Sequence, residues 1–243
     1  IVLINPDDRS KQYVKLKQAK ASELGINVEL HDWSGKDLAF CESKMTELSK
    51  QDSINGIIVQ LPAPGLDKLQ DLLDIIPAHK DVDGLSNASL EAIKNDQNSL
   101  IPATPRAIIE VLSRSVENLI AKKILIVGQG KLVGKPLAMI LTNKGYQLTT
   151  ADSNTADLTD LCKDSDVIVS AVGKSDLIHA SMLKNGAVVI DAGISEVGGK
   201  MTGDVNYTDM EQVASAIAKV PGGVGPVTVS CLLNNVVKAT KNP

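Results

Sequence analysis

The sequence of 243 residues predicts an α/β fold in which parallel sheets are covered by helices. Short apolar runs alternate with helical patterns along the chain, and the alternation restarts near residue 120 with Lys123–Val127. A glycine-rich turn follows that run, which is typical of a dinucleotide-binding domain. We therefore expect two α/β domains around a cleft, the second of them Rossmann-like.

The first part of the chain is expected to alternate strands and helices up to about residue 115. Ser10 is predicted to cap a helix over Ser10–Leu24 that Gly25 ends, and Thr104 to cap one over Thr104–Ser113 with Pro105 at its first position. Residues 77–103 hold turn-forming residues with little periodicity. The other predicted elements are the strands Ile1–Ile4, Val28–His31 and Gly56–Leu61 and the helices Asp37–Lys50 and Leu66–Ile76.

The second part repeats the pattern. A helix is predicted from about Lys135, directly after the glycine-rich turn, and a final helix over Val227–Lys241. The predicted strands are Lys123–Val127, Leu148–Ala151, Asp166–Ala171, Ala187–Ala192 and Ala216–Val220.

Composition excludes several classes of protein. The formal net charge is −4, whereas a general nucleic-acid binder shows a basic excess. No apolar run reaches the length of a membrane span, so no membrane partner is expected. The three Cys and three His are scattered, which indicates neither a disulfide framework nor a metal site and favours a reducing cytoplasm.

The glycine-rich turn carries the strongest local signal. Gly128, Gln129 and Gly130 begin a G-x-G-x-x-x-G pattern between a strand and a helix, where backbone N–H groups can bind a pyrophosphate. The alternative is a purely structural turn, and a Walker A loop is excluded because the glycine spacing differs and Pro136 replaces Ser or Thr. Asp152 ends the next strand, where it is either a ribose ligand or an ordinary loop residue.

Other segments allow two interpretations. Tyr13 and Lys17 share one helix face, either as a stacking ring beside an acid or base, or as part of a lysine-rich surface. Gln60 ends a buried strand, where ligands bind in open α/β sheets. Residues 80–84 are an acidic turn, either functional or a solvated loop or Asx-turn, and residues 220–228 are a shaped loop or a linker.

These segments together resemble a known family over nearly the whole chain. The chain is similar to the bifunctional methylenetetrahydrofolate dehydrogenase/methenyltetrahydrofolate cyclohydrolases, which carry corresponding motifs in the same order. In this sequence the motifs are YVKLK, VQLPAP, KDVDG, PATPR, VGQGKLVGKP, SAVGK, VIDAGI, GDV and VPGGVGPVTV.

The resemblance implies a folate-binding catalytic domain over residues 1–115 plus 226–243 and an NAD(P)-binding domain over 116–225, joined by long helices. It implies oxidation of 5,10-methylene-tetrahydrofolate to the methenyl form and hydrolysis of that form to 10-formyl-tetrahydrofolate, in one-carbon metabolism and purine biosynthesis. A cytoplasmic homodimer is expected. The family places a helical segment before the strand that begins at Ile1, so we expect that segment to be missing from the chain as given.

The family's motifs also imply roles for single residues. Lys17 would be the essential catalytic residue for hydration, held by Gln60, while Tyr13 would pack on the folate rings. Asp83 would accept two hydrogen bonds from the pterin edge, for which a carboxylate is suited. The remaining implied ligands are Gly128, Gln129 and Gly130 at the pyrophosphate, Ser153 at the adenosine ribose, Ile194 at the nicotinamide, and Pro221, Gly222, Gly223 and Thr228 beside the folate.

Some positions depart from the family pattern. Many members carry a basic residue after the first glycine of the turn or after the second strand, where this chain has Gln129 and Asp152-Ser153-Asn154. The cofactor is therefore NAD or NADP, with the residues favouring NAD. Ala103 replaces a usual Cys, and residues 85–88 differ from the common form.

Three alternatives stay open at this stage. One is a shikimate dehydrogenase-like oxidoreductase, which explains the turn at Gly128 but not VPGGVGP together with Y-x-x-x-K. Another is a non-catalytic folate- or dinucleotide-binding protein, which intact Tyr13, Lys17, Gln60 and Asp83 argue against. The third is a member that retains only one of the two activities.

Overall fold

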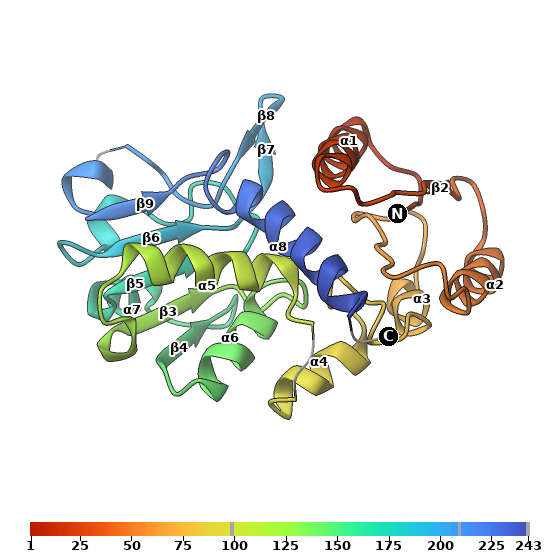
Figure 1. Ribbon diagram of the computed structural model, residues 1–243. Helices are drawn as coiled ribbons and strands as arrows, with labels where there is room; N and C mark the ends of the chain where they lie inside the picture. Colours follow the sequence, from red (N-terminus) through yellow and green to blue (C-terminus); the bar gives the residue numbers. More distant parts are fainter. Residues whose placement is uncertain (98–99, 209, 242–243) are drawn as a thin grey trace. The chain divides into compact units, whose positions relative to one another are not determined.

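The computed structural model describes residues 1–97, 100–208 and 210–241. Residues 98 and 99, in the predicted turn-rich segment, and 242 and 243, in the predicted first domain, lie outside the described residues. The chain forms two compact units, one of Ile1–Ala103 with Leu232–Pro243 and the other of Thr104–Cys231. The α/β prediction is confirmed, because parallel strands alternate with helices (Figure 1).

The first unit is built around a short parallel pair of strands. The strand β1 (Val2–Leu3) pairs with β2 (His31–Asp32), and residues 56–61 run alongside β1, where the Val2 amide donates to the Ile58 carbonyl at 2.8 Å. The predicted strand Gly56–Leu61 does not form a continuous strand, because its pairing consists of isolated bridges at Ile57 and Val59. The helices of this unit are α1 (Asp8–Glu23), α2 (Leu38–Ser49), α3 (Leu69–Asp74) and α4 (Asn87–Lys94).

Two predicted helix caps are wrong. The carboxylate of Asp7 accepts the Ser10 amide at 2.7 Å, so α1 begins before Ser10 and the prediction of Ser10 as its cap fails. The helix ends as expected, because Gly25 adopts a φ of +70°. The helix α5 (Ala103–Ser115) begins one residue before Thr104, which therefore lies inside the helix.

The helix α4 lies in a segment where no element was predicted. The Ser86 hydroxyl caps it by accepting the Ser89 amide at 3.2 Å. The fully buried side chains of α4 are Ser89 and Ile93. The helix has only eight residues, about two turns, which is too short for a long periodic pattern and explains why the sequence pattern missed it.

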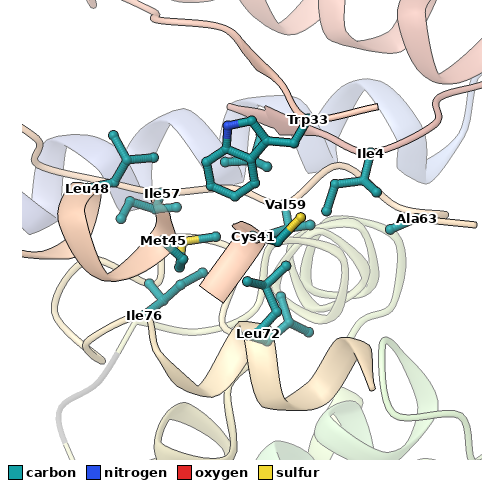
Figure 2. Close-up of a cluster of buried hydrophobic side chains, with 12 residues drawn as sticks. Ile4, Trp33, Cys41, Met45, Leu48, Ile57, Val59, Ala63, Leu72 and Ile76 are labelled. Carbon is teal, nitrogen blue, oxygen red and sulfur yellow. The ribbon is translucent and has the colours of Figure 1, made fainter. Parts of the chain in front are cut away.

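The core of the first unit gathers the only Trp and the only Phe of the chain. The rings of Trp33 and Phe40 meet edge to face, with centroids 6.5 Å apart and planes at 85°. Figure 2 shows Trp33 among side chains that include Ile4 directly after β1, Met45 of α2 and Leu72 of α3. The buried members of this cluster are Val2, Ile4, Trp33, Cys41, Met45, Leu48, Ile57, Val59, Ala63, Leu72, Leu73 and Ile76.

The second unit contains a five-stranded parallel sheet in the order β4-β3-β5-β6-β9. Its strands match the predicted ones within two residues at each end: β3 (Lys123–Val127), β4 (Gln147–Ala151), β5 (Val167–Ser170), β6 (Val188–Asp191) and β9 (Ala216–Ala218). The helix α6 (Gly134–Asn143) packs against β3 and β4, and α7 (Leu158–Asp164) against β3. The hairpin β7 (Ser195–Val197) and β8 (Lys200–Thr202) follows β6.

The final helix α8 (Val224–Ala239) contributes residues to both units, since the division falls between Cys231 and Leu232. Three short 3₁₀ turns complete the fold, at Leu119–Ala121, Ala180–Met182 and Met210–Gln212. No helix among the described residues is both long enough and apolar enough to cross a bilayer.

The strand order identifies where the sheet of the second unit can bind a ligand. The chain moves from β3 to one side at β4 and to the other side at β5, so the order reverses between β3 and β5. In open parallel sheets, ligands bind outside the carboxyl ends of the strands at such a point. The loops that begin at Gly128 and Ala171 lie there, close enough that a Cβ on Gly128 would be 2.5 Å from the Ala171 carbonyl oxygen.

Gly134 is required for the close packing of α6 on β3. A Cβ at this position would lie 1.8 Å from the Gly128 carbonyl oxygen, a backbone atom with little freedom to move. We expect Gly134→Ala to lower the free energy of unfolding by about 1–3 kcal/mol, the usual cost of overpacking. Gly130→Ala is the matched control, because nothing lies within 4 Å of its Cβ position. Urea unfolding curves measure both variants, and equal stability would contradict the packing argument.

Candidate active site and dinucleotide site

Three predicted catalytic side chains meet on one side of α1. The Lys17 ammonium donates to Gln60 Oε1 at 3.0 Å and lies 4.8 Å from the centroid of the Tyr13 ring. Gln60 Nε2 donates to the Leu61 carbonyl at 2.7 Å, which orients the amide so that its oxygen faces Lys17. Lys17 is only 6% exposed, so a lysine-rich surface is the wrong interpretation of this face.

In the acidic turn at residues 80–84, Lys80 and Asp81 bind the surrounding backbone, whereas Asp83 belongs to the candidate site. The Asp81 carboxylate accepts the Gly84 amide at 2.9 Å, the Ser86 amide at 2.8 Å and the Ser89 hydroxyl at 2.7 Å. Lys80 donates to two carbonyls near the end of α2. The Asp81 side chain does bind its own turn, but through amides three and five residues on rather than the two of an Asx-turn. A solvated loop is wrong, because Lys80 and Asp81 are buried.

Asp83 is the second carboxylate of this turn and interacts electrostatically with both Lys17 and Tyr13. Burial lowers the pKa of Lys17, and the attraction of Asp83 only partly opposes this. Burial likewise raises the pKa of Asp83, although Lys17 opposes the rise. The pKa of Tyr13 is raised to about 12, mainly by burial and further by Asp83, so its phenol stays neutral. The site thus holds a lysine that loses its proton more easily than usual.

One supporting residue was missed by the sequence reasoning. Asn235, fully buried in α8, donates through Nδ2 to the Val82 carbonyl at 2.9 Å and to the Ile101 carbonyl at 2.7 Å. These bonds hold the backbone next to Asp83 in place. Asn235 is 153 residues from Val82 along the chain, so no local pattern could have indicated this contact.

A cavity of about 310 Å³ in the first unit contains only one of the four predicted catalytic residues in its lining. Lys17 contributes to its lining, together with Ile1, Ile57 and residues of α8, but Tyr13, Gln60 and Asp83 do not.

The glycine-rich turn of the second unit fits a pyrophosphate. Gly128 has a φ of +98°, and the position of a Cβ on Gly130 is open. The side chain of Val133 does not cap α6. The Lys135 amide donates to the Gly130 carbonyl at 3.1 Å and Pro136 has no N–H, so at the start of this helix it is the Gly134 amide that could bind an anion. The Gln129 side chain donates to the Gly128 carbonyl at 3.0 Å, which folds it back on the turn.

The other predicted cofactor residues also follow strands of this sheet. Asp152 and Ser153 are exposed directly after β4, where Asp152 Oδ1 accepts the Asn154 amide at 2.9 Å and the Thr155 hydroxyl at 3.3 Å. Ile194 follows β6 and is 63% exposed. The loop with Pro221, Gly222 and Gly223 follows β9, and the Thr228 hydroxyl donates to the Val224 carbonyl within α8 at 3.1 Å.

A buried aspartate shapes the loop after β5. Asp204 accepts hydrogen bonds from the Ser170 hydroxyl and from the amides of Val172, Gly173 and Lys174, all at 2.7–2.8 Å. Asp204 belongs to the motif GDV, but the sequence did not indicate which backbone amides its carboxylate binds. Across the described residues, no group of three His, Cys, Asp or Glu side chains could hold a metal ion.

Comparison with known proteins decides the family. The family model "Tetrahydrofolate dehydrogenase/cyclohydrolase, catalytic domain" matches residues 1–83, and the model of its NAD(P)-binding domain matches residues 102–243. The chain belongs to the tetrahydrofolate dehydrogenase/cyclohydrolase family. It is a methylenetetrahydrofolate dehydrogenase and methenyltetrahydrofolate cyclohydrolase, as the sequence motifs predicted.

Relatives and solved structures agree with this assignment. The bifunctional protein FolD of Bacillus licheniformis is 37% identical over 246 residues, which cover 99% of this chain and 86% of that relative. The bifunctional dehydrogenase/cyclohydrolase of Thermoplasma acidophilum superposes with a TM-score of 0.93 at 33% identity, over 99% of this chain and 87% of that one. FolD of Trypanosoma brucei, solved with NADP and an inhibitor, has a TM-score of 0.91 at 31% identity, covering 99% and 85%.

The shikimate dehydrogenase alternative is explained by a shared fold. Shikimate 5-dehydrogenase of Thermus thermophilus has a TM-score of 0.58 and 12% identity, over 98% of each chain. At that identity the likeness concerns the fold alone.

The raised pKa of Asp83 predicts how stability depends on pH. The folded state binds the proton of Asp83 more tightly than the unfolded state, so Asp83 lowers stability increasingly as pH rises from 3.8 through its folded pKa. We expect Asp83→Asn to be more stable than the wild type at pH 7, by about 1.4 kcal/mol for each unit of pKa shift, and the difference to shrink toward pH 3.8.

Chemical unfolding at a series of pH values tests this expectation. Asp67→Asn, which removes an exposed carboxylate of the same unit, is the matched control. A gain for Asp83→Asn that is the same at every pH would show that the effect is not linked to ionisation.

Proposed function

We propose that Lys17, Tyr13, Gln60 and Asp83 form the folate site and catalyse the hydrolysis, and that residues 128–130, 152–153 and 194 bind the dinucleotide. Residues 1–115 plus 226–243 would form the folate-binding domain and 116–225 the dinucleotide-binding domain. The observation that carries this proposal is the bond from a buried Lys17 to Gln60 at 3.0 Å, with Asp83 and Tyr13 around it.

Folate binding follows from the chemistry of these side chains. The Asp83 carboxylate can accept two N–H bonds from the amino-pyrimidinone edge of the pterin, because the local backbone amides are bound by Asp81 instead. Such donors would also compensate for the burial of Asp83. Tyr13 presents a neutral ring on which the planar part of the substrate can stack.

Hydride transfer depends mainly on orientation. When bound, the nicotinamide accepts a hydride from the methylene carbon of 5,10-methylene-tetrahydrofolate. The open backbone at Gly130 and the Gly134 amide would hold the pyrophosphate, and Ile194 would give the nicotinamide an apolar surface. Pro221, Gly222, Gly223 and Thr228 would contact the folate, and the hydride step requires near contact of the donor and acceptor carbons.

Hydration uses Lys17 as the base. Water adds to the electrophilic methenyl carbon, forming a C–O bond, and Lys17 in its neutral form takes the proton that the water loses. The hydroxyl of this adduct then loses its proton and becomes the formyl carbonyl as the bond from the carbon to N5 breaks, and N5 gains a proton, which gives 10-formyl-tetrahydrofolate. Gln60 holds the lysine nitrogen at the site, and the positive methenyl group would lower the pKa of Lys17 further.

Replacement of Lys17 tests its role. We expect Lys17→Met to reduce cyclohydrolase activity at least about 100-fold, the usual scale of acid–base catalysis. The dehydrogenase activity and the fold should stay unchanged. Loss of methenyl absorbance measures hydrolysis, and its appearance measures oxidation. Lys15→Met, on the exposed side of the same helix, is the control. Full cyclohydrolase activity in Lys17→Met would overturn the assignment of Lys17 as the base. A wild type that oxidises the methylene form but does not hydrolyse the methenyl form would be a member with only the dehydrogenase activity.

We propose that NAD is preferred to NADP. Asp152 stands exposed at the end of β4, where its carboxylate can accept hydrogen bonds from ribose hydroxyls and repels a 2′-phosphate. Asn154 and Gln129 are uncharged and cannot form an ion pair with that phosphate. Ser153 could still donate one hydrogen bond to it. The charge next to β4 therefore favours NAD.

Dehydrogenase rates with each dinucleotide measure this preference. We expect kcat/KM to be about tenfold higher with NAD, a difference of about 1.4 kcal/mol. Asp152→Ser should narrow the ratio, whereas Asp160→Ser, which removes an exposed charge in α7, should leave it unchanged. A large NADP preference in the wild type would refute the proposal.

We further propose that the enzyme acts as a cytoplasmic homodimer in one-carbon metabolism that supplies purine biosynthesis. The resemblance to the family supports the dimer. Three free, buried cysteines suit a reducing compartment. A net charge of −4 argues against nucleic acid as a partner.

A further inference from the structure

A buried carboxylate at the end of β6 collects four hydrogen bonds. Asp191 is fully buried, and its Oδ1 accepts the Gly193 amide at 3.1 Å and the Asp204 amide at 3.0 Å. Its Oδ2 accepts the Val205 amide at 3.0 Å and the hydroxyl of Tyr207 at 2.7 Å. Three of the donors are backbone amides of loops at the sheet edge, but the fourth is a side chain with a further partner.

The Tyr207 hydroxyl connects this carboxylate to the loop after β9. It donates to Asp191 and accepts the Val220 amide at 2.8 Å, so a single oxygen joins the two. Burial and the bond to Asp191 both raise the pKa of Tyr207, so the phenol keeps the proton that this arrangement needs.

The loop that begins at Lys219 is closed on itself. The Gly223 amide donates to the Lys219 carbonyl at 2.7 Å, and Gly222 adopts a φ of +105° that a residue with a side chain rarely adopts. A Cβ on Gly223 would lie 2.6 Å from the Lys219 carbonyl oxygen. Pro221 and Gly222 are exposed at its tip. A tight turn of this kind moves as one piece, so a bond at its base controls where its tip lies.

We propose that Tyr207 is a positioning residue for the dehydrogenase step, because its hydroxyl fixes the base of the loop that carries Pro221, Gly222 and Gly223. This inference rests on the proposed function, which assigns those three residues to the folate side of the site. The Tyr207 ring contributes through packing and through the Lys219 ammonium 5.6 Å from its centroid, and neither contribution requires the hydroxyl. The hydroxyl alone ties the phenol to the Val220 amide.

Tyr207→Phe tests the hydroxyl without removing the ring. We expect the KM for methylene-tetrahydrofolate in the dehydrogenase assay to rise about fivefold, the ratio that corresponds to one lost hydrogen bond of about 1 kcal/mol. The kcat should stay within about twofold, since the reacting groups are unchanged. The kcat of hydrolysis at Lys17 should also stay within about twofold. Tyr146→Phe is the matched control, because it removes the hydroxyl from another tyrosine ring in the same unit. The backbone amide of Tyr146 donates to the Leu141 carbonyl, and this bond does not involve the hydroxyl.

Hydrogen exchange at the Val220 amide gives an independent readout. We expect this amide to exchange at least about fivefold faster in Tyr207→Phe than in the wild type, while the Gly223 amide, bonded within the loop, changes less. An unchanged KM with a lowered melting temperature would show a purely structural tyrosine and overturn the proposal. An equal rise of KM in Tyr146→Phe would overturn it too.

The two proposals can fail separately. A wild type without dehydrogenase activity would refute the proposed function, and exchange at Val220 would then still decide whether Tyr207 holds the loop. An active wild type whose Tyr207→Phe variant matches it in KM and in Val220 exchange would refute only the role of Tyr207.

Discussion

Backbone amides that converge on buried carboxylates fix the loops of both units. Asp81 binds two amides of its own turn, and Asp191 and Asp204 bind three each at the carboxyl edge of the parallel sheet. Many loop amides have no neighbouring strand to pair with, and a buried amide without an acceptor is costly. These aspartates meet that need, and they leave nearby side chains such as Asp83 and Ile194 available for ligands.

The folate site depends on a second balance, between burial and charge. A buried lysine costs free energy as long as it is charged, and the nearby Asp83 offsets only part of this cost, because the pKa of each group is still shifted toward its neutral form. The same imbalance suits Lys17 to the proposed role of a base. Stability is thus lower where the chemistry requires a proton to move, as perturbed groups at functional sites generally show.

Helices and strands could be predicted from the sequence where one face of the element, or both faces, is buried and apolar. The strands β3, β5 and β6 are runs of Val, Ile and Leu that are buried on both faces, and their predicted bounds were right within a residue. The helix α4 was missed because it has only eight residues, too few for a long periodic pattern, and the cap at Ser10 was wrong because the Asp7 carboxylate, three residues earlier, accepts the Ser10 amide and starts the helix before it. Local polar contacts decide such ends, and several residues can make them.

The sequence by itself determined the fold class, the family and the identity of the candidate site residues, because motifs such as Y-x-x-x-K and K-D-V-D-G keep functional side chains at short, fixed spacings. Only the tertiary structure decided what supports them. Tyr207 is 13 residues from Val220 and 16 from Asp191, and Asn235 is 153 residues from Val82. A hydrogen bond depends on distance and direction in space, and those are set by the packing of strands and helices that no spacing along the chain records.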